Sequence, residues 1–185
     1  MSVSRPPVRA FMLVSFFLAA LGTVPVASAR FDSGAGPTAV ATADREVVTF
    51  SRVGSLRLGE STEADVVDIA GNPDDVDESE EFSGLHRYFG YRCGGQFCVT
   101  TYDLLDGVLV GFASRSKSFS TSRGSRPGLR RRTAERRERR KARVGCAGLA
   151  ISRTRIGDTL DLLFSRGKVS VIVSHTSEAG SFFGC

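Results

Sequence analysis

The chain has 185 residues with 25 basic and 20 acidic side chains, a formal net charge of +5. This length allows one compact domain or two small repeats with a shared core, and it excludes a large multidomain enzyme. The charge is unevenly divided, because residues 30–112 carry 6 basic and 15 acidic side chains and residues 113–185 carry 17 and 5. Such asymmetry indicates either two halves that attract each other or regions for different partners.

Residues 1–29 have the pattern of a secretory signal peptide. Arg5 and Arg9 precede an apolar run over residues 10–24, and small residues follow up to Ala29. This order predicts cleavage after Ala29 and a mature protein that is secreted or extracytoplasmic, in the cell envelope. The alternative is an uncleaved membrane anchor, which needs a longer apolar run of about 20 residues.

A flexible leader is predicted over residues 30–45, because small polar residues dominate and apolar residues show no period. A first folded unit is predicted over residues 46–116. Its helix begins at Thr62, which can form a capping box with Asp65. The helix ends at Gly71, because glycine adopts a left-handed conformation at no cost and a proline follows two residues later.

Residues 74–81 contain six carboxylates and are predicted to form a solvated acidic loop. Calcium is the alternative, because clustered carboxylate oxygens suit a hard cation. The segment lacks the ligand spacing and the central glycine of a calcium loop. No metal site and no cofactor are therefore predicted.

Three strands are expected after this loop, at residues 85–92, 97–105 and 108–114. Aromatic and β-branched residues are frequent in them. Asp106-Gly107 separates the last two and is a strong signal for a tight hairpin.

A second, basic unit is predicted over residues 117–185. A helix from about residue 133 precedes strands at residues 146–152, 159–165 and 169–174, so the order of the first unit recurs. The predicted fold class is α+β, with two tandem helix plus antiparallel-sheet units that are disulfide-bridged.

Four cysteines, Cys93, Cys98, Cys146 and Cys185, lie in the predicted mature chain. In an oxidising compartment an even number of cysteines indicates two disulfides. Three pairings are open, and pairing of the first two and of the last two is favoured because two glycines allow the first loop to close. The spacing of the first two is not the two-residue gap of redox motifs.

The helix region resembles a known family. Gly59, Thr62, Asp65 and the Gly71-x-Pro73 exit resemble the outer-membrane assembly lipoprotein family (SmpA/OmlA, also called BamE), over about residues 51–115. Two such units in tandem resemble the architecture of the β-lactamase inhibitory proteins, which are secreted binders. The resemblance implies a small helix and antiparallel sheet in each unit and a binding function.

The arginine-rich segment 123–143 holds ten arginines and Lys141 against two glutamates. Between residues 130 and 143 the only apolar residues are Ala134 and Ala142, so a helix here has little to bury. It is expected to project into water, to be partly disordered, or to lie across acidic surface of the first unit. The residues predicted to bind a polyanion are Arg130, Arg131, Arg132, Arg136, Arg137, Arg139, Arg140 and Arg143.

The leading functional hypothesis is a non-enzymatic, inhibitor-like binding protein that acts through exposed sheet surface and loops, with an unidentified protein partner. The alternative is a polyanion-binding envelope protein that uses the arginine-rich segment to bind an anionic cell-envelope polymer or a membrane surface. Nucleic acid is disfavoured by export and by the lack of aromatic residues between residues 119 and 164.

No catalytic residue is predicted, and the chain is not expected to be an enzyme. The two histidines, His86 and His175, are interpreted as half-buried strand residues. Ser174 precedes His175, but no nucleophile-elbow motif surrounds any serine. A small hydrolase is the third hypothesis.

Overall fold

The structure is a computed structural model that describes residues 45–81, 83–92, 94, 98–145 and 148–179. All of these belong to one compact unit. The predicted signal peptide and the predicted leader up to residue 44 lie outside the described residues.

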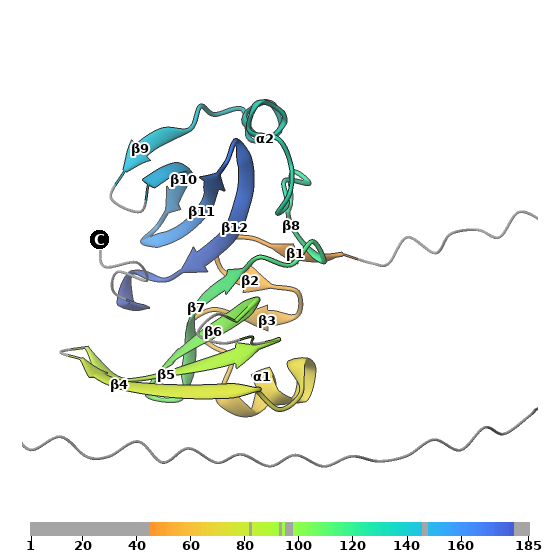
Figure 1. Cartoon of the computed structure of the whole chain (residues 1–185). Helices are drawn as coiled ribbons and strands as arrows, with labels where there is room; N and C mark the ends of the chain where they lie inside the picture. The colour runs from red at the N-terminus through yellow and green to blue at the C-terminus, as the bar shows by residue number, and fades with distance from the viewer. Residues whose placement is uncertain (1–44, 82, 93, 95–97, 146–147, 180–185) are drawn as a thin grey trace, which may run out of the picture. The chain divides into compact units, whose positions relative to one another are not determined.

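Strands make up most of the described backbone (Figure 1). They form a four-stranded sheet in the order β3-β2-β1-β8 and an eight-stranded sheet in the order β4-β5-β6-β7-β12-β11-β10-β9. The elements are β1 (Glu46–Val48), β2 (Arg52–Val53), β3 (Leu56–Arg57), α1 (Glu63–Ala70), β4 (Asp75–Glu81), β5 (Gly84–Tyr91), β6 (Thr100–Leu105), β7 (Val108–Ser114), β8 (Phe119–Thr121), α2 (Arg131–Glu138), β9 (Arg143–Gly145), β10 (Gly148–Arg155), β11 (Asp158–Ser165), β12 (Lys168–His175) and the 3-10 helix η1 (Ser177–Ala179).

The predicted fold class, two tandem helix plus sheet units, is wrong. Two antiparallel meanders, β4–β7 and β9–β12, join edge to edge where β12 pairs with β7, and the result is one eight-stranded sheet. At this seam Ile172 pairs with Ser114 and His175 with Gly111. The join satisfies backbone groups that two separate sheets would leave unpaired at their edges. The chain is therefore mostly β.

The tight hairpin predicted at Asp106-Gly107 is confirmed. These two residues have φ of 49° and 84° and join β6 to β7. Positive φ at both central residues defines the turn type that matches the twist of a hairpin. Arg166-Gly167, with φ of 50° and 72°, joins β11 to β12 in the same way.

The acidic segment is a strand, so its prediction as a loop is wrong. β4 pairs with β5 along its whole length, from Asp75 opposite Gly90 to Glu81 opposite Gly84. It is an edge strand of the large sheet, and most of its residues are exposed. Charged side chains on an edge strand oppose pairing with other chains, which gives the acidic run a structural role.

Helix α1 confirms its predicted start and end. The Thr62 hydroxyl accepts from the Asp65 backbone N–H, and the Asp65 carboxylate accepts from the Thr62 backbone N–H at 2.7 Å. Gly71 ends the helix with a φ of 83°. The side chain of Val66 is fully buried in the core.

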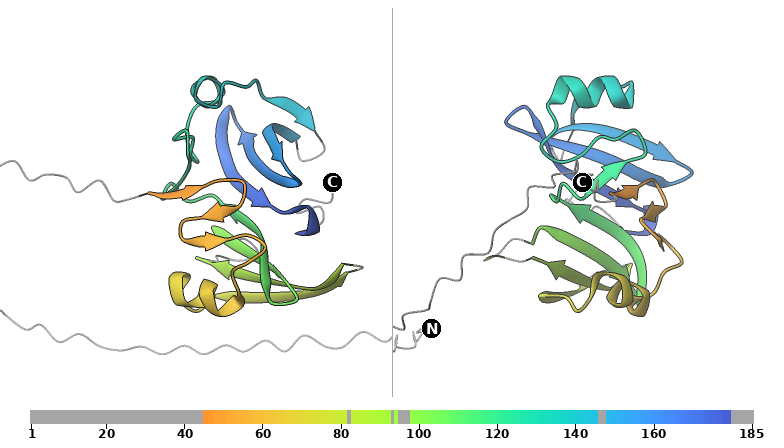
Figure 2. Two further views of the ribbon diagram at one scale, coloured as in Figure 1. Left: turned by 180° about the vertical axis from the view of Figure 1, so that it is seen from behind. Right: turned by 90° about the vertical axis from the view of Figure 1, so that its right-hand side faces the viewer.

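One face of the large sheet is covered by α1, the four-stranded sheet and α2, with the two helices near opposite ends (Figures 1 and 2). The core lies between these layers and includes Phe112, Leu104, Leu162, Ile172 and Leu56. The opposite face of the sheet carries His86 and Asp103, which are described below.

The cysteine pairing stays a prediction. Cys98 is the cysteine that the structure describes, and it is not a free thiol. Cys93, Cys146 and Cys185 lie outside the described residues, so no complete disulfide is seen in the described part of the chain.

Candidate anion-binding site

The start of α2 is fixed to the turn between β11 and β12. The Arg131 backbone N–H donates to the Gly167 carbonyl at 2.9 Å, and the Gly128 N–H donates to the Val169 carbonyl at 2.8 Å. Arg130 forms an isolated bridge with Lys168. These backbone bonds place the first arginines of the helix beside Arg166 and Lys168, which the sequence separates from them by more than 30 residues.

The two glutamates of α2 point inward. Glu138 is 1% exposed, accepts from the Thr121 hydroxyl at 2.7 Å, and pairs with Arg153 at 3.3 Å. Glu135 is 8% exposed and pairs with Arg131 at 3.0 Å and with Lys141 at 3.7 Å. Both carboxylates are thus bound within the protein, and the outward surface of the helix is left to its arginines.

None of the three expected arrangements of this segment is correct. α2 neither projects into water nor crosses the first half of the chain, since it packs against β12 of its own half. Its inward side consists of the fully buried Ala134 and the two paired glutamates. Charge pairs therefore replace the apolar stripe that usually anchors a surface helix.

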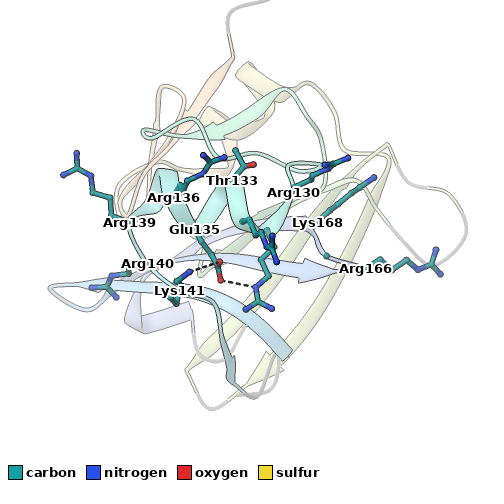
Figure 3. Close-up of a pocket in the computed structure, with 12 residues that line it drawn as sticks. Arg130, Thr133, Glu135, Arg136, Arg139, Arg140, Lys141, Arg166 and Lys168 are labelled. Atoms are coloured by element: carbon teal, nitrogen blue, oxygen red, sulfur yellow. Dashed lines mark hydrogen bonds and ion pairs between the residues drawn. The ribbon is translucent and has the colours of Figure 1, made fainter.

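The outward residues of α2 and the neighbouring turn line an open groove of about 1200 Å³. Figure 3 shows labelled cationic side chains on both sides of Glu135, with Lys141 paired to its carboxylate and Arg139 and Arg166 extending away from it. Nine cationic side chains and one carboxylate line it. The cationic residues are Arg130, Arg131, Arg132, Arg136, Arg139, Arg140, Lys141, Arg166 and Lys168.

Most of this positive charge is uncompensated. Among the described residues, no acidic side chain forms an ion pair with Arg132, Arg136 or Arg139. The Ala142 backbone N–H, at 3.0 Å, and the Arg131 guanidinium hold the pKa of Glu135 below its usual range. The single carboxylate of the groove is therefore ionised and already bound to cations.

Six of the eight arginines predicted to bind a polyanion line the groove. The other two do not line it, because the Arg137 guanidinium donates to the Gly124 carbonyl and Arg143 lies in β9. Sequence reasoning missed Arg166 and Lys168. The available signal was the Arg-Gly-Lys turn at residues 166–168, which is recognisable as a hairpin but gives no indication of what lies beside it.

The interpretation of both histidines as half-buried strand residues is wrong for His86. His86 is fully buried in β5, where its Nδ1 lies 2.9 Å from Oδ1 of Asp103. His175 is partly exposed on β12. Ser174 points to the opposite face, where its hydroxyl donates to the Thr49 carbonyl at 2.7 Å, so it forms no site with His175.

The described residues contain no cluster of three or more histidine, cysteine, aspartate or glutamate side chains arranged to hold a metal ion. Within the same part of the chain, no helix combines the length and the apolar character needed to cross a bilayer.

No protein-family model and no curated protein matches the chain. A crystal structure of the uncharacterized protein yfeY from Escherichia coli aligns with a TM-score of 0.46 and 13% identity, over 70% of this chain and 99% of that chain. An extracellular protein containing a SCP domain from Bacillus anthracis aligns with a TM-score of 0.41 and 7% identity, over 64% of this chain and 44% of that chain. At these levels neither similarity assigns a fold family or a function.

Proposed function

We propose that the protein is an extracytoplasmic binding protein that holds an anionic polymer or an anionic membrane surface in the groove beside α2. The observation that carries this proposal is the orientation of the helix: its glutamates are buried and paired, and its arginines face solvent. A groove with nine cations and one internally bound carboxylate attracts repeated negative charge.

The predicted signal peptide supports an extracytoplasmic ligand. In the cell envelope the abundant polyanions are phosphate-containing polymers and lipid headgroups, whose oxygens accept two hydrogen bonds from one guanidinium. The groove is open and lined by long side chains, which suits a flexible ligand better than a rigid small molecule. N-terminal sequencing of the purified protein is expected to begin at Arg30.

The direct test measures binding of the purified protein to inorganic polyphosphate and to phosphatidylglycerol vesicles at several salt concentrations. Replacing Arg132, Arg136 and Arg139 by glutamine is expected to weaken binding about 100-fold at 0.1 M salt. The slope of log affinity against log salt should become shallower by roughly 2 to 3. Each phosphate contact that is lost means that about one counterion fewer is released on binding.

A matched control separates the groove from net charge. Arg45, Arg52 and Arg155 are exposed, lie outside the groove, and remove the same three charges when replaced by glutamine. This triple variant should bind nearly as well as the unchanged protein. Equal losses in both triple variants, or binding that does not depend on salt, would contradict the proposed site.

A second candidate function is recognition of a protein partner through exposed sheet surface. Val144 in the edge strand β9 is 84% exposed, and Ile156 in the β10–β11 turn is 93% exposed. Apolar side chains of this size on an edge and a turn can contact another protein. Such binding should depend little on salt and should survive the substitution of the groove arginines.

A further inference from the structure

Three hydrogen-bonded side chains lie near the turn between β4 and β5, on the sheet face opposite the core. Ser83 Oγ lies 2.9 Å from Nε2 of His86, and Nδ1 of His86 lies 2.9 Å from Oδ1 of Asp103. In the tautomer with the proton on Nδ1, His86 donates to the ionised Asp103 carboxylate. Nε2 then accepts from the Ser83 hydroxyl.

The strand register produces this arrangement. Tyr88 of β5 is directly opposite Asp103 of β6, and His86 is two residues earlier on the same face. The Tyr88 ring stacks on the imidazole, with ring centroids 5.9 Å apart and planes 16° apart. The imidazole is thus held in orientation by a ring as well as by Asp103.

The backbone that follows Ser83 is held by hydrogen bonds to Asp106 in the β6–β7 turn. The Leu85 N–H donates to the Asp106 carboxylate at 3.2 Å, and the Asp106 N–H donates to the Leu85 carbonyl at 3.0 Å. A Cβ at Gly84 would lie 2.8 Å from the same carboxylate, and φ there is 137°, so glycine is required. These contacts hold Ser83 above the imidazole.

The three hydrogen-bonded side chains differ sharply in solvent exposure. His86 is 0% and Asp103 is 1% exposed, whereas Ser83 is exposed. The serine hydroxyl is therefore the point at which a buried base meets solvent. This is the order of exposure that a serine nucleophile requires, with the general base oriented behind it.

We propose that Ser83 is a nucleophile, that His86 is its general base, and that Asp103 positions His86, which gives the protein an esterase activity on small activated esters. Ser83 Oγ attacks the carbonyl carbon and its proton passes to Nε2 of His86. The bond to the leaving alcohol breaks, and the alcohol departs with that proton. Water then attacks the acyl-serine while His86 accepts its proton, the bond between the carbonyl carbon and Ser83 Oγ breaks, and His86 returns that proton to Ser83 Oγ as the carboxylic acid leaves.

The substrate class follows from where the hydroxyl lies. Ser83 is exposed at a turn, so its substrates are those that react without being enclosed, with a leaving group that needs little help. Burial raises the pKa of Asp103, the hydrogen bond and the charge of His86 lower it, and Glu81 on β4 and His175 on β12 act on it more weakly. This activity does not depend on the groove that α2 lines.

The first test uses a fluorophosphonate probe and a p-nitrophenyl acetate assay, with mass spectrometry to locate the adduct. The unchanged protein should be labelled on Ser83, and Ser83→Ala should abolish both labelling and hydrolysis. His86→Gln should slow labelling by about 100-fold or more, since a positioned base contributes 10² to 10⁴. Ser55→Ala, at an exposed turn elsewhere, should leave the labelling rate unchanged.

A second test avoids changes to buried residues. Ser83→Cys places a thiol beside His86, and Ser55→Cys places one at an exposed turn elsewhere. Iodoacetamide should alkylate the first thiol at least tenfold faster at pH 6.5, because a neighbouring imidazole promotes the thiolate. The proposal is overturned if the two thiols react at equal rates or if the probe leaves Ser83 unlabelled.

Discussion

Helices α1 and α2 are docked on the large sheet by the same backbone contacts but are held by different side chains. The Glu63 N–H donates to Gly107 and the Arg131 N–H donates to Gly167, each at the turn of the last hairpin of its meander. α1 then uses a capping box and a buried valine, whereas α2 has no side-chain cap. A common attachment therefore leaves the helix surface free to differ, and only α2 exposes a surface made of arginines.

The largest expected effect tests the charge pairs that replace an apolar face in α2. Glu138→Ala should destabilise the protein by about 3 kcal/mol, because it leaves Arg153 largely buried without its carboxylate. Urea unfolding measures this change. Glu60→Ala is the control, since the exposed pair of Glu60 with Arg57 should contribute about 0.5 kcal/mol or less. Equal losses would show that α2 is not held by its buried glutamates.

The second effect tests the apolar contact of α1. Val66→Ala should cost about 2 kcal/mol in the same measurement, because it removes methyl groups from the fully buried side of the helix. Ile69 is 45% exposed, so Ile69→Ala should cost less than about 0.5 kcal/mol. A small loss at Val66 would place the anchoring of α1 elsewhere.

A third effect concerns the cap that distinguishes the helices. Thr62→Ala should destabilise the protein by about 1 kcal/mol, because the Asp65 N–H loses its side-chain acceptor.

The counterpart in α2 is Arg130, which makes no side-chain cap bond. Arg130→Ser should stabilise α2 by a few tenths of a kcal/mol and weaken polyphosphate binding, and thermal unfolding together with the binding assay checks both. A gain in both stability and binding would contradict the assignment of Arg130 to the groove.

The smallest effect is the response of α1 to acid. Hydrogen bonds from the Thr62 backbone N–H and hydroxyl lower the pKa of Asp65 below its ordinary value of 3.8. A lowered folded-state pKa gives stability that is present above pH 3.8 and is lost as the pH falls through the folded value. Asp65→Asn removes the titrating group and should reduce this acid dependence in unfolding measured between pH 2 and 5, and an unchanged profile would exclude Asp65 as its source.

The sequence predicted what short-range chemistry decides. The Thr62 capping box, the Gly71 exit and the Asp106-Gly107 hairpin each depend on residues within a few positions of one another, and the structure confirms them. β4 was missed because its run of carboxylates lacks the β-branched residues that indicate a strand. Its position at a sheet edge, which makes such a composition favourable, is a property of the whole fold.

Long-range pairing explains the other differences. The seam between β7 and β12 joins Ser114 to Ile172, and nothing local to either strand marks it as the join. The sequence predicted only part of the groove. The arginine run was evident, but Arg166 and Lys168 lie beside it only because the β11–β12 turn pairs with the start of α2. Ser83, His86 and Asp103 likewise share no motif, since only the register of β5 and β6 brings the last two together.

The seam also sets how the molecule can be divided. A fragment that ends at residue 116 would lose β12 and leave β7 with a row of unbonded amides and carbonyls beside an uncovered Phe112. Such an edge recruits a strand from another copy, so the isolated fragment should pair with itself or aggregate. Each meander therefore depends on the other, because each supplies the strand that pairs with the other's last strand.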